Sequence, residues 1–90
     1  MMTIEFFEQL KGIMASKTNI MSIFTNNKLR YIVNNIDGKW YIPSFPEYYT
    51  HTYVPTDIYG VINLIKETKD ISEIRLGTSD GKVTKLPINQ

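Results

Sequence analysis

The fold of this chain is decided by residues 19–43, which read NIMSIFTNNKLRYIVNNIDGKWYIP. Two turn signals divide the stretch into three apolar segments. Asn26-Asn27 tolerates the positive φ angles that a tight hairpin needs, and Asp37-Gly38 is a strong turn dipeptide. Three apolar segments joined by two tight turns predict a three-stranded antiparallel meander.

The order of large side chains in these segments predicts which residues share a face of the sheet. Successive side chains of a strand point to opposite faces, so every second residue lies on the same side. The pattern predicts three groups, one for each strand: Ile20 with Phe24, Leu29 with Tyr31 and Val33, and Trp40 with Ile42.

Two segments of helical period flank the meander. Residues 3–16 place an apolar stripe behind a predicted N-cap at Thr3, and residues 56–69 place a second stripe behind a cap at Thr56 or Asp57. The first stripe is Ile4, Phe7, Leu10 and Met14, widened by Phe6 and Ile13, and the second is Ile58, Val61, Ile62 and Ile65, flanked by Leu64.

The rest of the chain adds further strands. Residues 72–87 read as a hairpin around Ser79-Asp80-Gly81, and THTYV at 50–54 reads as a short edge strand. The expected order is α-β-β-β-(β)-α-β-β. An antiparallel sheet of four to six strands would then bury both helix stripes on one face. We expect a small single α+β domain over residues 1–90.

Composition excludes several kinds of chemistry. The chain has no Cys, a single His and a net charge of +1. It contains no phosphate-binding glycine motif, serine elbow or metal-ligand motif. We therefore expect no catalytic residues, no cofactor and no metal, and a protein that is not an enzyme. The sequence shows neither a signal peptide nor an apolar run of about 20 residues, so we expect a cytoplasmic location without a membrane.

The segment 40–59, WYIPSFPEYYTHTYVPTDIY, holds most of the aromatic residues and no Lys or Arg. Trp40 and Phe45 are expected in the core, and Tyr59 is expected to keep its hydroxyl at the surface. A small core cannot hide every ring of the Pro-bounded loop, and Tyr is enriched at protein interfaces. The predicted partner-binding residues are Glu47, Tyr48, Tyr49, His51 and Tyr53.

These features favour a protein-binding module that acts through the aromatic loop. The chain is rich in Ile, Lys and Asn and has a single Ala, which is typical of AT-rich coding sequence. We therefore expect a phage- or plasmid-encoded accessory protein that inhibits a host protein, as anti-defence proteins do. A homodimer is the other form of protein contact, because the edge strand at 50–54 could pair with its symmetry mate.

The alternative function is a small nucleic-acid-associated regulator that uses basic hairpins. Its contacts would be Lys28, Arg30, Lys39, Arg75, Lys82 and Lys85. The element order over residues 3–69 resembles that of the double-stranded-RNA-binding domain. That family sets a Lys-rich patch at the start of its last helix. This chain has PTDIYGVINLI there, without a basic residue, so nucleic acid is the less favoured partner.

Overall fold

The computed structural model describes residues 2–16, 18–44 and 52–88. The helices are α1 (Ile4–Ala15) and α2 (Ile58–Glu67). The strands are β1 (Thr18–Thr25), β2 (Lys28–Ile36), β3 (Lys39–Pro43), β4 (Tyr53–Thr56), β5 (Ile71–Thr78) and β6 (Val83–Pro87). The order α-β-β-β-β-α-β-β confirms the predicted α+β class.

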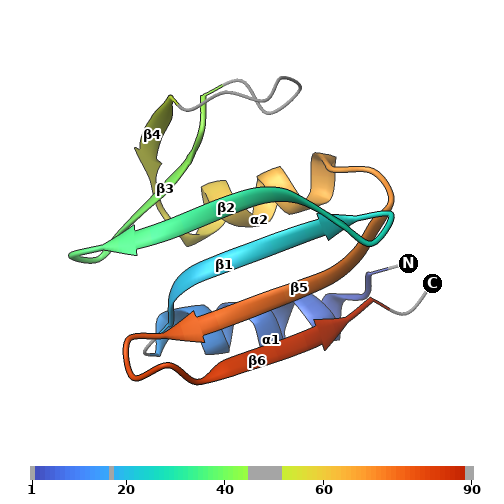
Figure 1. Ribbon diagram of the computed structural model, residues 1–90, viewed down its shortest axis with the longest axis horizontal. Helices are drawn as coiled ribbons and strands as arrows, with labels where there is room; N and C mark the ends of the chain where they lie inside the picture. Colours follow the sequence, from blue (N-terminus) through green and yellow to red (C-terminus); the bar gives the residue numbers. More distant parts are fainter. Residues whose placement is uncertain (1, 17, 45–51, 89–90) are drawn as a thin grey trace.

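All strands belong to one antiparallel sheet with the order β4-β3-β2-β1-β5-β6. The meander β1-β2-β3 forms as predicted, and β5 adds to the free side of β1. In Figure 1 both helices lie behind the sheet, α2 beside β2 and β3 and α1 behind β5 and β6. The front of the sheet carries no helix. No described helix combines the length and the apolar character that crossing a membrane requires.

Both helices begin at the predicted caps. The Thr3 hydroxyl accepts a hydrogen bond from the backbone N–H of Phe6 at 3.1 Å. The Asp57 carboxylate accepts one from the N–H of Gly60 at 2.9 Å, so Asp57 rather than Thr56 caps α2. Each bond satisfies a donor that the first helical turn leaves free.

The two turns of the meander adopt the predicted backbone. Asn26 and Asn27 have φ of 49° and 66°, and Asp37 and Gly38 have φ of 53° and 88°. Two consecutive positive φ angles define the turn whose twist matches that of paired strands. The turn chemistry therefore fixes both hairpins locally.

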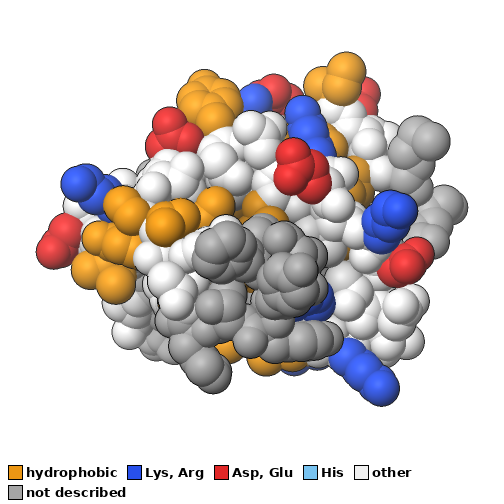
Figure 2. Space-filling view, turned by 90° about the horizontal axis from the view of Figure 1, so that it is seen from above, with side chains coloured by type: hydrophobic (Ala, Val, Ile, Leu, Met, Phe, Trp, Pro, Cys, Tyr) orange, Lys and Arg blue, Asp and Glu red, His pale blue; other side chains and the backbone are white. Residues whose placement is uncertain are grey.

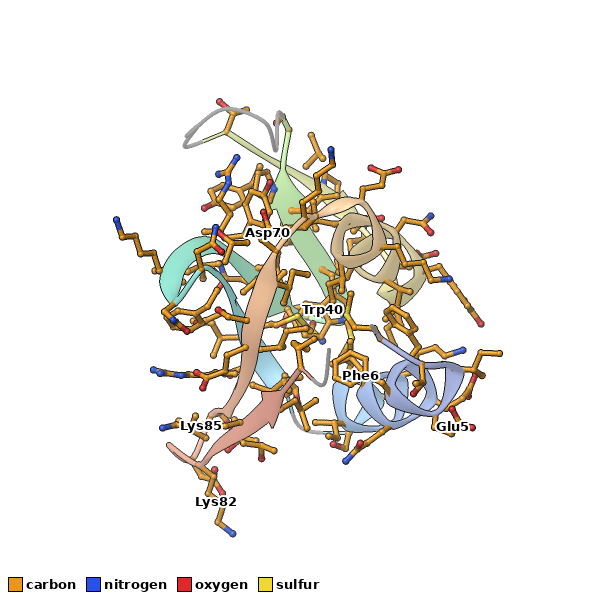
Figure 3. All side chains as sticks on the ribbon, turned by 90° about the vertical axis from the view of Figure 1, so that its right-hand side faces the viewer. Glu5, Phe6, Trp40, Asp70, Lys82 and Lys85 are labelled. Atoms are coloured by element: carbon orange, nitrogen blue, oxygen red, sulfur yellow. The ribbon has the colours of Figure 1, made fainter. Side chains whose placement is uncertain are left out.

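The core lies between the sheet and the helices. Figure 3 shows Trp40 and Phe6 in this layer, and the Trp40 side chain is only 2% exposed. Both helices contribute to the core, with Leu10 and Met14 from α1 and Val61, Ile62, Leu64 and Ile65 from α2. The predicted core position of Trp40 is thus confirmed.

The predicted stripe of α1 is wrong at its first residue. Ile4 is 79% exposed, whereas Phe6, Phe7 and Ile13 pack against the core. Six helical residues separate Ile4 from Leu10, and at 3.6 residues per turn the two side chains point about 120° apart. Phe6, four residues before Leu10, takes the position on the buried face.

The buried residues of β1 are not the apolar pair that the sequence pattern grouped. Met21 and Ile23 are fully buried, while Ile20 and Phe24 share the other face. Leu29 also departs from its predicted group. The β1–β2 register shifts after Ile23, so Leu29 pairs with Phe24 and joins its face, away from Tyr31 and Val33. Such a bulge adds one residue and moves the next side chain to the other face.

The short edge strand predicted at 50–54 is described in part, because residues 50 and 51 lie outside the described residues. The strand β4 includes Tyr53, continues past residue 54 to Thr56, and pairs with β3 at the edge of the sheet. Pro55 lies inside it, opposite Tyr41. Proline lacks a backbone N–H, which suits an edge strand.

Candidate protein-binding surface

The face of the sheet that lies away from the helices, here termed the open face, is assembled from all the described strands. Ile20 of β1 pairs with Asn34 of β2 and Gly77 of β5, and Gly77 pairs with Val83 of β6. Residues in one such row, and every second residue along each strand, share a face. The open face includes Ile20, Ser22, Phe24, Leu29, Ile32, Asn34, Ile36, Lys39, Tyr41, Pro43, Tyr53, Pro55, Glu73, Arg75, Gly77, Val83 and Lys85.

Large aliphatic side chains are exposed on the open face. Ile36 is 57% exposed and Val83 is 62% exposed, and Ile20 and Leu29 are exposed as well. Phe24, Ile32 and Tyr41 are half-buried and add further apolar area to the open face. Seen from above in Figure 2, hydrophobic side chains gather at the surface on the left, where Figure 1 places the β2–β3 turn. Apolar area collected on one face is typical of an interaction site.

Gly77 of β5 lies between Ile20 of β1 and Val83 of β6 on the open face. A Cβ atom at Gly77 would lie 2.7 Å from Cγ2 of Ile20, so the Ile20 side chain rests on the β5 backbone. Val83 lies directly beyond Gly77 in the same row. Because Gly77 has no side chain, the Ile20 side chain can occupy this position over β5.

A salt bridge lies on the open face at β5. The Arg75 guanidinium lies over the Phe24 ring, with its central carbon 4.4 Å from the ring centroid. The same guanidinium is ion-paired with the Glu73 carboxylate two residues earlier. This arrangement neutralises Arg75 and covers one face of the Phe24 ring.

The two layers of the molecule differ in charge. Glu73 is the single acidic residue in the described strands, whose other charged residues are Lys28, Arg30, Lys39, Arg75 and Lys85. The acidic residues Glu5, Glu8, Asp57 and Glu67 lie in the helices or their caps. Figure 3 shows Lys85 on the side of the sheet away from the helices. The open face is therefore apolar with an excess of positive charge.

The aromatic loop predicted to bind a partner is only partly described. Glu47, Tyr48, Tyr49 and His51 lie outside the described residues, as does Phe45. Tyr53 lies at the start of β4, opposite Pro43, and is 40% exposed. Tyr59 is exposed on α2, in agreement with its predicted position, and lies near Lys11.

The structure does not gather the six cations of the nucleic-acid alternative into one patch. Arg75 and Lys85 are partners across β5 and β6. The turns that carry Lys39 and Lys82 lie at one end of the sheet, and the turn before Lys28 lies at the other (Figure 1). Arg30 lies at the β2 bulge, with its guanidinium carbon 4.3 Å from the centroid of the Tyr31 ring.

Two hollows lie at the ends of α2. The larger, of about 610 Å³, is lined by Met14, Ser16, Asn35, Trp40, Asp57 and Tyr59 among others. The smaller, of about 430 Å³, is lined by Arg30, Tyr31, Glu67, Lys69 and Asp70 among others. In the larger hollow the Asp57 carboxylate already caps α2. The described residues contain no group of three side chains able to hold a metal ion.

Comparisons with protein-family models, curated proteins and solved structures found no match for the chain. The candidate surface is therefore interpreted from its own chemistry. Sequence reasoning predicted a sheet with a bare face but did not identify the residues on it. One signal in the sequence pointed to this face. In β1, Ile20 and Phe24 alternate with Met21 and Ile23, so both faces of this strand are apolar.

Proposed function

We propose that this chain is a non-enzymatic protein-binding module whose contact surface is the open face of the sheet. The observation that carries the proposal is the exposure of Ile20, Leu29, Ile36 and Val83 on a face that no helix covers. Tyr53 of β4, which lies opposite Pro43 of β3, would extend this surface at the edge of the sheet. Tyr48 and Tyr49 lie outside the described residues and belong to the proposal on the aromatic composition of their segment alone.

The dimensions of the molecule suit a contact of ordinary size. Its two longer dimensions are 33 and 29 Å, and the sheet faces the viewer of Figure 1 across both. A stable protein interface buries roughly 800 Å² on each partner. A face of this size can supply that area without the helix layer.

The side chains on the open face are well suited to binding. Fully burying an exposed Val, Leu or Ile side chain contributes about 1.5–3 kcal/mol, and each of these side chains would gain a part of that. Ile and Val have few side-chain conformations to lose, and strands hold them in place before binding. Ordering costs that oppose association are therefore small.

The biological setting that we propose is an accessory protein of a phage or plasmid that inhibits a host protein in the cytoplasm. Its support is the small size of the chain, the AT-rich amino-acid usage and the lack of catalytic motifs in the sequence. The open face would block its target by occupying a surface that the target needs.

The test compares matched substitutions on the two faces. Ile36→Asp and Val83→Asp, combined in one chain, place charges on the open face, and Ile4→Asp places one at an exposed Ile of α1. Tagged chains are expressed in the native host, and captured proteins are identified by mass spectrometry after nuclease treatment. Urea denaturation and circular dichroism verify that each variant is folded.

We expect the unmodified chain and Ile4→Asp to retain the same protein at stoichiometric amounts, and the open-face variant to lose it. Retention of that protein by the open-face variant would overturn the proposal. Loss of all bound material on nuclease treatment would also overturn it and would favour the basic hairpins.

A further inference from the structure

We infer that the partner presents to the open face a protein surface with an apolar centre and acidic residues around it. The inference rests on the proposed function and adds the chemistry of the partner. It follows from the positions of Lys39 and Lys85 relative to the aliphatic side chains and to the single acidic residue of the sheet.

Lys39 and Lys85 form no ion pair within the part of the chain that the structure describes. The ion pairs found there are Lys11 with Glu8 and Arg75 with Glu73. Glu73 is thus already engaged by Arg75. Lys39 and Lys85, both exposed, add positive charge to the open face, and the nearest acidic residue in sequence to Lys39 is Asp37 in the adjoining turn.

The two lysines flank the apolar area. Lys39 pairs with Ile36 at the β2–β3 end of the face, and Lys85 lies on the edge strand β6, two residues from Val83. The exposed aliphatic side chains of Ile20, Ile36 and Val83 lie between or beside them. An apolar centre with charges near its margin is the usual composition of a protein interface. Potentials across an interface are complementary, so the matching margin of the partner is acidic.

This charge distribution disfavours a second copy of the chain as the occupant. A two-fold symmetric dimer sets one patch against the same patch of the other copy. Glu73, the one acidic residue of the described strands, is paired with Arg75 of its own chain. Self-docking would therefore place lysines against a surface of the same sign, and like charges oppose association.

The residue types on the open face disfavour nucleic acid. Sheets that bind single strands expose aromatic rings on which bases stack, with cations between them. The two most exposed apolar side chains here, Ile36 and Val83, are aliphatic, and the Tyr41 ring is half-buried. The Phe24 ring is covered on one face by Arg75. An acidic protein surface accounts for both the aliphatic centre and the lysines.

The experiment reverses the charge of the two lysines. The probe is the purified protein that the unmodified chain captures, and its affinity is measured by isothermal titration calorimetry between 50 and 500 mM NaCl, a range of about tenfold in salt. The variant is Lys39→Glu with Lys85→Glu. The control is Lys69→Glu with Lys66→Glu, which changes the net charge equally on the helix side.

We expect the open-face charge variant to bind at least roughly tenfold more weakly at 50 mM NaCl, and the control to change affinity less than about threefold. Affinity of the unmodified chain should fall as salt rises. Replacing the partner's acidic residues with Lys should restore binding to the charge-reversed variant.

Equal losses in the two variants, or affinity that does not respond to salt or charge reversal, would overturn the inference while leaving the proposed function intact. Retention of partner by the Ile36→Asp and Val83→Asp chain would overturn the proposed function itself. If sedimentation shows a dimer that Val83→Asp dissociates, the partner is a second copy of the chain. If the chain captures nucleic acid alone, the partner is nucleic acid. Either result would overturn the inference of an acidic protein partner. Failure of the unmodified chain to retain any protein would contradict both proposals.

Discussion

Gly60 in the first turn of α2 lies directly against the side chain of Thr56 at the end of β4. A Cβ atom at Gly60 would lie 1.9 Å from Oγ1 of Thr56 and 2.9 Å from its Cβ. Rotating the Thr56 side chain cannot clear the space, because rotation leaves its Cβ in place and that atom is itself too close. The absence of a side chain at Gly60 therefore allows α2 to approach the strand that precedes it.

This contact predicts that replacing Gly with Ala has opposite effects on stability in α1 and in α2. Gly12→Ala in α1 should raise the free energy of unfolding by about 1 kcal/mol, the usual gain of Ala over Gly in a helix. Nothing lies within 4 Å of a Cβ at Gly12. Gly60→Ala should lower it by roughly 1–3 kcal/mol, because overpacking outweighs that gain. Urea denaturation measures both, and a stabilising Gly60→Ala would refute the contact.

Trp40 should report the integrity of the core. It is the single Trp of the chain and is 2% exposed. Its fluorescence should lie at short wavelength in the folded protein, resist quenching by iodide and shift to longer wavelength on unfolding. Trp40→Ala should cost about 3–5 kcal/mol. The neighbouring half-buried Tyr41 on the open face gives the control, and Tyr41→Ala should cost much less. Similar costs for the two would contradict the assigned faces.

The turn at Asn26-Asn27 should depend on residues that accept positive φ. Asn27 has φ of 66°, so Asn27→Gly should preserve or raise stability, while Asn27→Val should lower it by about 1–2 kcal/mol. Asn19→Val, in the exposed part of β1, tests the same change without a positive φ and should be close to neutral. Thermal unfolding of the three variants compares them. Equal stabilities of Asn27→Val and Asn19→Val would argue against this turn.

Asp80 should give the β5–β6 turn a dependence on pH. The hydroxyl of Thr78 and the backbone N–H of Lys82 donate to its carboxylate, and these bonds hold the pKa of Asp80 below its ordinary value. A lowered pKa in the folded state means that the stabilisation is present above the unfolded pKa of about 3.9 and is lost as pH falls through the folded value.

Titration of the Asp80 carboxyl by NMR should therefore give a midpoint below that of an unstructured aspartate. Thr78→Val should raise this midpoint, since it removes the largest cause of the shift. Asp80→Asn should weaken the loss of stability between neutral and acid pH. A midpoint that Thr78→Val leaves unchanged would show that the hydroxyl does not set the pKa.

The sequence by itself determined the features that depend on neighbouring residues. Positive φ at Asn26, Asn27 and Gly38 follows from residue types that tolerate it, and the caps Thr3 and Asp57 act within three residues of their own position. The helices, the meander and the last hairpin follow from these signals and from hydrophobic period. Such interactions are local, so they can be predicted without knowing where the rest of the chain lies.

Tertiary structure alone decided which face of the sheet became the candidate site. Both faces of β1 are apolar, and period two cannot tell Met21 and Ile23 from Ile20 and Phe24. The local pattern does not predict that β1 pairs with β5, some fifty residues away. It also does not predict the bulge that moves Leu29 to the other face of the sheet. The helices pack over Met21 and Ile23, and that choice leaves Ile20, Ile36 and Val83 exposed on the face that we propose binds a partner. Burial is a property of the whole packed chain, which is why the site appears only once the helices are placed against the sheet.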